Sequence, residues 1–90
     1  MCFEWNSTKA AANLTKHGVS FQEAATVFRD PLSVTGADPD HSYDEERFIT
    51  IGASTGGRLL IVAHTDHGDT IRIINTRPVT AGERVIYEES

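Results

Sequence analysis

Cysteine is nearly absent from this sequence, with Cys2 as the single cysteine among 90 residues. A chain with one cysteine forms no internal disulfide, which excludes the small disulfide-rich secreted domains. Cys2 also has no histidine or second cysteine close to it in the sequence. We therefore expect this thiol to be neither a metal ligand nor a catalytic nucleophile.

Long apolar runs are missing as well. No segment approaches the ~20 consecutive apolar residues of a membrane-spanning helix, and the N-terminus lacks the basic and apolar regions of a signal peptide. Hydrophobic residues at 39% and charged residues at 23% are typical of a soluble globular chain. The length allows one domain, residues 1–90, with one modest core. We therefore expect a single cytoplasmic domain without a membrane partner.

Positive charge is scarce, since 8 Lys and Arg against 13 Asp and Glu give a net charge of −5. Phosphate contacts need Lys or Arg, so this balance by itself argues against binding of nucleic acid. The charges are unevenly distributed, however, because five acids crowd into residues 38–46. A basic patch can form on this acidic chain if its two ends meet in space. The cations near the ends are Lys9, Lys16, Arg72, Arg77 and Arg84.

The beginning of the chain predicts a short strand followed by a helix. Residues 3–5 alternate in apolar character, which favours a strand. Asn6 or Ser7 offers an N-cap for a helix over residues 8–17. Gly18 stands where a left-handed residue commonly ends a helix, so the helix is expected to stop before it.

A helical wheel divides this first helix into two faces. Ala10 and Leu14 lie on the side expected to face the core. Lys16 and His17 suit the negative end of the helix dipole, or they present a cation and a titratable imidazole at the edge of a cleft. Both interpretations remain open from the sequence. The polar face carries Lys9, Asn13 and Lys16, with His17 at its border.

A second helix is predicted immediately afterwards. Ser20 and Glu23 form a capping-box pattern, and the residue before Pro31 disfavours a helical backbone. Apolar residues repeat at helical spacing in between, at Phe21, Ala24, Ala25 and Phe28. An extended piece over 32–34 and a polar loop over 36–46 are expected to follow.

Three β-strands and a final helix complete the prediction. Leu59–Ala63 is apolar without alternation, so its strand is expected at the centre of the sheet, buried on both faces. Thr80 and Glu83 form a second capping-box pattern for a short helix through Tyr87. This order predicts an α+β fold: a short N-terminal strand and two helices on a curled antiparallel sheet, then a C-terminal helix. The strands are 47–54, 58–65 and 70–76, joined by turns at 55–57 and 66–69.

The acidic residues 38–46 match no known metal site. Pro39 interrupts them and the glycine of a calcium loop is missing, while contiguous carboxylates do not converge as in two-metal nucleases. We interpret the segment as a solvated loop, except that Glu46 begins a strand beside Arg47 and can point into a cleft. No metal is predicted, because the spacing of the other candidates fits no ligand pattern; these are His64, Asp66, His67 and Asp69.

Arginines near the C-terminus form a candidate phosphate-binding surface. Arg72 lies among isoleucines in the third strand and must face solvent, a partner or a site. Arg77 follows five residues later, so a regular strand puts it on the opposite face unless the strand ends or bulges between them. Asn75, Thr76 and Pro78 are compatible with such an end or bulge. Arg84 and Tyr87 follow in the final helix. Phosphate binding and ordinary surface ion pairing are both compatible with this set.

Taken in order, these features resemble the BrnT family of toxins over nearly the whole chain. The N-terminal half carries Phe3-Glu4-Trp5, Lys9, Asn13, Lys16-His17-Gly18, Phe21, Glu23-Ala24 and Asp30-Pro31. The remainder carries Glu46-Arg47-Phe48, Gly52, Leu59-Leu60-Ile61-Val62, Ile71–Arg77, Glu83-Arg84 and Tyr87. Three places depart from the family pattern: Asn6 for Asp, Asn75-Thr76 for Ser-Ala, and Ala81-Gly82 where basic residues are common.

The resemblance implies a RelE-like fold and a ribonuclease that halts translation by cutting RNA. It also implies a BrnA-like antitoxin with a ribbon-helix-helix part, through which the pair binds operator DNA and represses its own operon. No cofactor is implied. The positions that match the family motifs are Lys16, His17, Glu46, Arg47, Arg72, Arg77, Arg84 and Tyr87.

Two hypotheses about activity follow. In the first, the 2′-hydroxyl of RNA attacks the adjacent phosphate, which requires a base, an acid and cations for the developing charge. The assignments are Arg72 and Arg77 for charge, His17 or Glu46 as base, Tyr87 or His17 as acid, and Lys9, Lys16, Arg47 and Arg84 for RNA binding. In the second, the chain is a module without chemistry that docks a basic antitoxin and acts as co-repressor.

Overall fold

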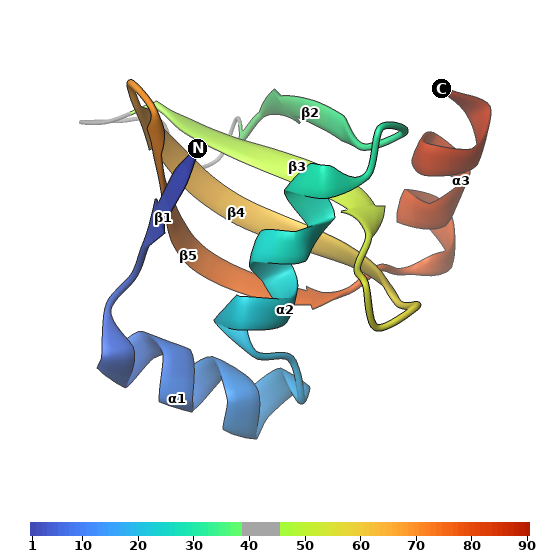
Figure 1. The fold of residues 1–90 in the computed structure, drawn as a ribbon. Helices are drawn as coiled ribbons and strands as arrows, with labels where there is room; N and C mark the ends of the chain where they lie inside the picture. Colours follow the sequence, from blue (N-terminus) through green and yellow to red (C-terminus); the bar gives the residue numbers. More distant parts are fainter. Residues whose placement is uncertain (39–45) are drawn as a thin grey trace.

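The computed structural model describes residues 1–38 and 46–90 (Figure 1). Their order is β1 (Cys2–Glu4), α1 (Ser7–His17), α2 (Phe21–Thr26), a 3-10 helix η1 (Val27–Arg29), β2 (Val34–Ala37), β3 (Arg47–Ala53), β4 (Leu59–His67), β5 (Thr70–Pro78) and α3 (Ala81–Glu89). The α+β class predicted from the sequence is confirmed over this part of the chain.

The strands form one sheet in the order β1-β5-β4-β3-β2. β4 is central, and each residue of 60–65 is buried, which confirms the prediction from its apolar run. The prediction of a purely antiparallel sheet was wrong, because β1 pairs with β5 in parallel. Helices α1 and α2 and strands β2 to β4 lie between β1 and β5 in the sequence. This long connection allows β5 to run beside β1 in the same direction. The predicted loop also begins too early, since Gly36 and Ala37 pair with β3.

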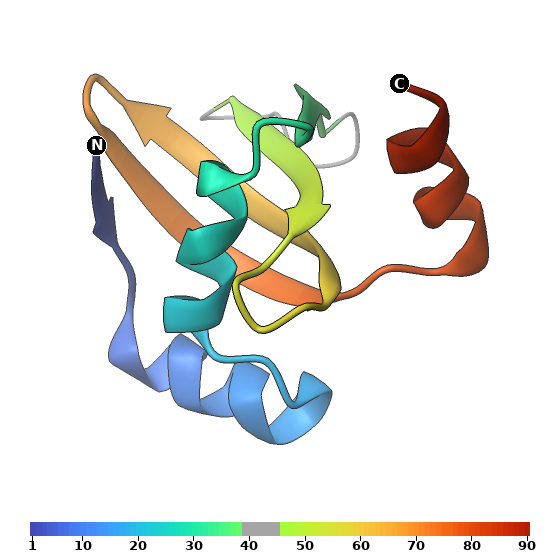
Figure 2. The ribbon, with the colours of Figure 1, turned by 45° about the vertical axis from the view of Figure 1, so that its right-hand side comes forward.

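Helices α1 and α2 pack against β5, and η1 packs against β3. Figures 1 and 2 show α2 crossing one face of the sheet while α3 lies at the far end of the strands. The core between α2 and the sheet is apolar and fully buried at Phe21, Leu60 and Val62. Trp5 packs at one side of this core, where its ring stands edge-on to that of Phe21 with 6.0 Å between the ring centroids. This packing leaves the opposite face of the sheet without a covering α1 or α2.

The predicted helix ends are largely confirmed. Asn6 Oδ1 accepts the Lys9 N–H at 3.0 Å at the start of α1, and Gly18 ends it with a φ of 69°. The Thr80–Glu83 capping box is complete. The box predicted at Ser20 is only half formed, because the Glu23 carboxylate instead accepts from Arg58 Nε at 3.0 Å and from Ser54 Oγ at 2.7 Å.

The predicted faces of α1 are partly wrong. Leu14 was assigned to the core, yet it is 52% exposed, whereas Asn13 from the polar face is 7% exposed. The reason lies in the tertiary structure. Helix α1 meets the sheet at the outer edge of β5, where the backbone N–H and C=O groups have no neighbouring strand to bond with. A side-chain amide satisfies such groups and an apolar side chain does not.

His64 is a buried polar residue on the central strand. Its Nδ1 lies 2.7 Å from Asp66 Oδ1, its Nε2 lies 2.8 Å from Thr50 Oγ1, and the Phe28 ring stands edge-on to it at 4.9 Å. Burial lowers the pKa of His64, and the nearby Asp66 carboxylate opposes that shift to a smaller extent. The ring is therefore neutral at pH 7, with Nδ1–H donating to Asp66 and Nε2 accepting from Thr50.

This burial makes stability depend on pH. The unfolded chain binds a proton at His64 below its ordinary pKa of about 6.5, whereas the folded protein does so only at lower pH. The free energy of unfolding is therefore expected to fall as pH drops below about 6.5, by at most about 1.4 kcal/mol per pH unit from this group. Urea unfolding of wild type and His64→Gln from about pH 7.5 to 5 measures this slope.

The slope should be shallower in His64→Gln than in wild type. Equal slopes in wild type and His64→Gln would contradict the assignment to His64.

Candidate functional site

A β-bulge sets the direction of the C-terminal arginines. His64 pairs with Ile73 and the preceding Ala63 pairs with Asn75, so Ile74 is an extra residue in β5. One extra residue inverts the alternation of side chains along a strand. Arg72 and Arg77 therefore lie on the same face of the sheet, on the side opposite the α2 core. This meets the condition from the sequence that the strand must bulge for the two arginines to share a face.

Asn13 fixes α1 against the outer edge of β5. Its Nδ2 donates to the carbonyl oxygens of Thr76 at 2.9 Å and Val19 at 3.0 Å, and its Oδ1 accepts the Thr76 N–H at 3.1 Å. β1 pairs with β5 only as far as Arg72. The buried amide therefore takes the place of a neighbouring strand farther along β5, and this holds the polar face of α1 beside the strand.

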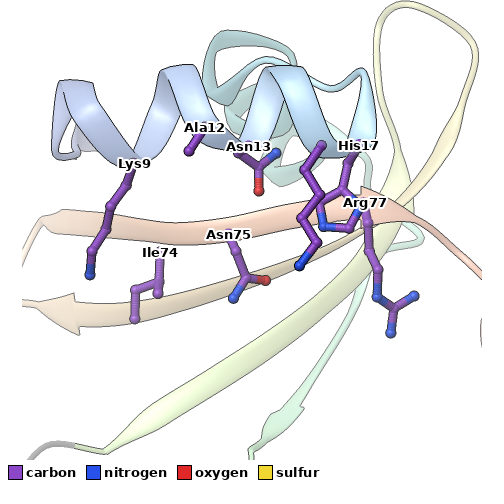
Figure 3. A pocket seen from close by; sticks show the side chains of 8 residues that line it. Lys9, Ala12, Asn13, His17, Ile74, Asn75 and Arg77 are labelled. Carbon is purple, nitrogen blue, oxygen red and sulfur yellow. The ribbon is translucent and has the colours of Figure 1, made fainter.

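A hollow of about 480 Å³ lies between α1 and β5, and we name it the α1–β5 hollow. From α1 it is lined by Lys9, Lys16 and His17, and Figure 3 shows the labelled side chains of Lys9 and His17 extending towards β5. From β5 it is lined by Asn75 and Arg77. None of these described lining residues is acidic, so the two cationic ends of the chain meet in a local basic site.

A second hollow of about 260 Å³ adjoins it on the open face of the sheet, and we name it the sheet-face hollow. Ile49, Ile61 and Ala63 line it with apolar side chains from β3 and β4. Its polar lining comes from Arg47, Asp38 and Glu83, together with Asn75 and Arg77. Because the last two residues line both hollows, the two hollows adjoin at Asn75 and Arg77 on β5.

Arg77 is held in place by α3. Its two terminal nitrogens donate to Glu83 Oε1 at 2.7 Å and Oε2 at 2.8 Å. These bonds are the main cause that lowers the pKa of Glu83 to about 2, so the carboxylate stays charged at neutral pH. Arg77 Nε donates no hydrogen bond to any residue that the structure describes. The guanidinium is thus oriented while one of its N–H groups remains available to a ligand.

Four other predicted residues lie outside the two hollows. Arg72 is exposed, and its Nη1 lies 3.6 Å from Glu4 Oε1. The Tyr87 hydroxyl donates to Asp30 Oδ2 at 2.6 Å, which raises the pKa of Tyr87 and ties α3 to the end of η1. Glu46 and Arg84 are exposed. Of the nine residues predicted, the structure brings together Lys9, Lys16, His17, Arg47 and Arg77.

Sequence reasoning missed two asparagines. Asn13 was placed on the polar face of α1 but given no role, although its spacing from Lys9 and Lys16 already put it among them. Asn75 was noted as a departure from the family pattern and as one of the residues compatible with a bulge in the strand, but it was given no role in the site. Its side chain is exposed, forms no hydrogen bond with the described residues and lines both hollows. The sequence allowed a bulge or a strand end in this region, but it did not place the bulge at Ile74, which is what turns Asn75 to this face.

Within residues 1–38 and 46–90, no three His, Cys, Asp or Glu side chains gather as metal ligands would. His64 and Asp66, considered as candidates from the sequence, bond to each other as described above. No helix in the same ranges is long and apolar enough to cross a membrane.

Comparison with known proteins identifies relatives of this fold and sequence. Residues 5–83 match the family model for BrnT, described as the ribonuclease toxin of a type II toxin–antitoxin system. The crystal structure of the Brucella abortus ribonuclease toxin BrnT is similar, with a TM-score of 0.64 and 20% sequence identity. That match covers 89% of this chain and 97% of the Brucella chain. Comparison with curated protein sequences gives no match.

Proposed function

The chain belongs to the BrnT family of ribonuclease toxins of type II toxin–antitoxin systems, and we propose that it cuts RNA as a metal-independent, RelE-like endoribonuclease. The observation that carries this proposal is the α1–β5 hollow, whose lining brings Lys9, Lys16 and Arg77 beside His17 and includes no acidic residue among those described. Glu83, the ion-pair partner of Arg77, lines the adjoining sheet-face hollow instead. Such a site attracts a phosphodiester even on a chain whose net charge is −5.

The proposed reaction is an internal transfer within RNA. The 2′-oxygen attacks the adjacent phosphorus, the bond from phosphorus to the 5′-oxygen breaks, and a 2′,3′-cyclic phosphate forms. His17 removes the 2′-hydroxyl proton, and its imidazolium returns a proton to the leaving 5′-oxygen. Arg77 stabilises the charge that develops on the phosphate, and Lys9 and Lys16 position the RNA backbone.

His17 is preferred over the other acid–base candidates on position. It is half-buried at the C-terminal end of α1 and lines the hollow. Tyr87 is bonded to Asp30, and Glu46 lines neither hollow. Arg72 and Arg84 remain candidates for contacts with RNA beyond the cleaved phosphate, and Arg47 for contacts on the sheet face.

The proposed partner is a BrnA-like ribbon-helix-helix antitoxin that neutralises the toxin in the cytoplasm and through which the pair reaches operator DNA. A purely regulatory role without chemistry is the second candidate. It is favoured by one observation: Glu83 already occupies both terminal nitrogens of Arg77.

Expression without an antitoxin tests the proposal. Induced wild-type protein is expected to arrest bacterial growth, and purified protein is expected to cut labelled single-stranded RNA in EDTA, leaving cyclic-phosphate ends. Normal growth and intact RNA in the presence of folded protein would instead support the regulatory role. Cleavage that EDTA abolishes would rule out the metal-independent reaction.

A further inference from the structure

The two adjoining hollows differ in the charge of their lining, which indicates that they hold different parts of one ligand. The α1–β5 hollow carries cations and no acid among the described residues. The sheet-face hollow has Arg47 and Arg77 opposed by Asp38 and Glu83, around an apolar floor. A phosphate suits the first lining, whereas a neutral, flat group with polar edges suits the second.

We propose that the sheet-face hollow binds a single nucleobase of the RNA and that Asn75 reads the hydrogen-bonding edge of that base. This inference rests on the proposed function, and it adds a base-specific subsite to the phosphate site. The hollow of about 260 Å³ is below the ~300–1,000 Å³ of pockets for drug-sized ligands, so it suits one ring system.

Position also supports a nucleotide as the ligand. Asn75 and Arg77 line both hollows, so a phosphate in one and a base in the other are joined by a short path across β5. The base of a nucleotide is separated from its own phosphate by a single sugar, which matches two subsites that share a wall. Side chains beneath the base would be Ile49, Ile61 and Ala63, whose apolar surfaces can contact its flat face.

Asn75 is suited to reading a base because its amide offers one donor group and one acceptor, the pattern by which asparagine pairs with base edges. The side chain is exposed and its amide has no partner among the described residues. Asn13, by contrast, has its amide saturated by backbone groups. Of the two asparagines lining the α1–β5 hollow, only Asn75 is therefore free to bind a ligand.

Short oligodeoxynucleotides test the subsite without cleavage, because they lack the attacking 2′-hydroxyl. Fluorescence anisotropy would compare oligomers of adenine, cytosine or thymine with an abasic oligomer of the same length. Wild type is expected to bind the preferred base about tenfold more tightly than the abasic chain. Asn75→Ala and the space-filling Ala63→Leu should reduce that ratio towards one, because the loss of affinity falls on the base-carrying oligomers.

Lys16→Ala is the matched control, since loss of a phosphate contact should weaken every oligomer by the same factor. If wild type binds abasic and base-carrying oligomers equally, or if Asn75→Ala weakens both equally, the base subsite is overturned while RNA cleavage can stand. If no oligomer binds, both proposals fail. If Asn75→Ala weakens only antitoxin binding, the hollow is a protein interface and the inference is overturned.

Discussion

Arg77→Ala is expected to lower the rate of RNA cleavage by about 10²–10³-fold, because it removes a preoriented donor from the charge that develops on the phosphate. The guanidinium lines both hollows and is fixed by its two hydrogen bonds to Glu83. Arg77→Lys keeps the charge but loses the planar fork, so an intermediate loss is expected. Single-turnover cleavage of a labelled RNA measures these rates.

The loss must be separated from the effect of loosening α3. Glu83→Ala breaks the same ion pair and leaves the Arg77 guanidinium in the protein, so it is the matched control. It should retain most of the cleavage that Arg77→Ala loses. Equal losses in the two variants would show that Arg77 acts only by holding α3. As a second control, Arg29→Ala removes an exposed arginine outside the hollows and should cleave RNA as fast as wild type.

Asn13→Ala is expected to destabilise the fold by about 3–5 kcal/mol, since it leaves three buried backbone groups of Val19 and Thr76 without partners. A loss of this size is a large part of the total stability of a small domain. Denaturant unfolding measures the change. The control is Asn75→Ala, which removes the same side chain from an exposed position and should cost less than about 0.5 kcal/mol.

Asn13→Asp tests the reason for the effect. The aspartate oxygen can still accept the Thr76 N–H, but its second oxygen would face the carbonyl oxygens of Thr76 and Val19 and repel them. It should therefore be destabilising although its shape is nearly the same. A variant as stable as wild type would show that the amide donor contributes nothing at this position.

Local rules were enough to predict most helices and strands. Asn6, Gly18 and Thr80 act through bonds within one or two turns, so their roles can be read from neighbouring residues. The apolar run of β4 predicted a strand buried on both faces, because only the centre of a sheet buries every residue in a row. The cations of α1 could also be assigned to one face, since helical spacing sets that face.

Long-range pairings decided the rest. The parallel pairing of β1 with β5 and the bulge at Ile74 both depend on strand register, which no local pattern specifies. That bulge turns Asn75 and Arg77 towards the open face of the sheet, and the Asn13 amide then sets α1 beside them. The sequence by itself thus determined the elements and the residue types of a basic site. Only the tertiary structure determined that Lys9, Lys16, His17 and Arg77 share it, because their approach depends on contacts across more than sixty residues of chain.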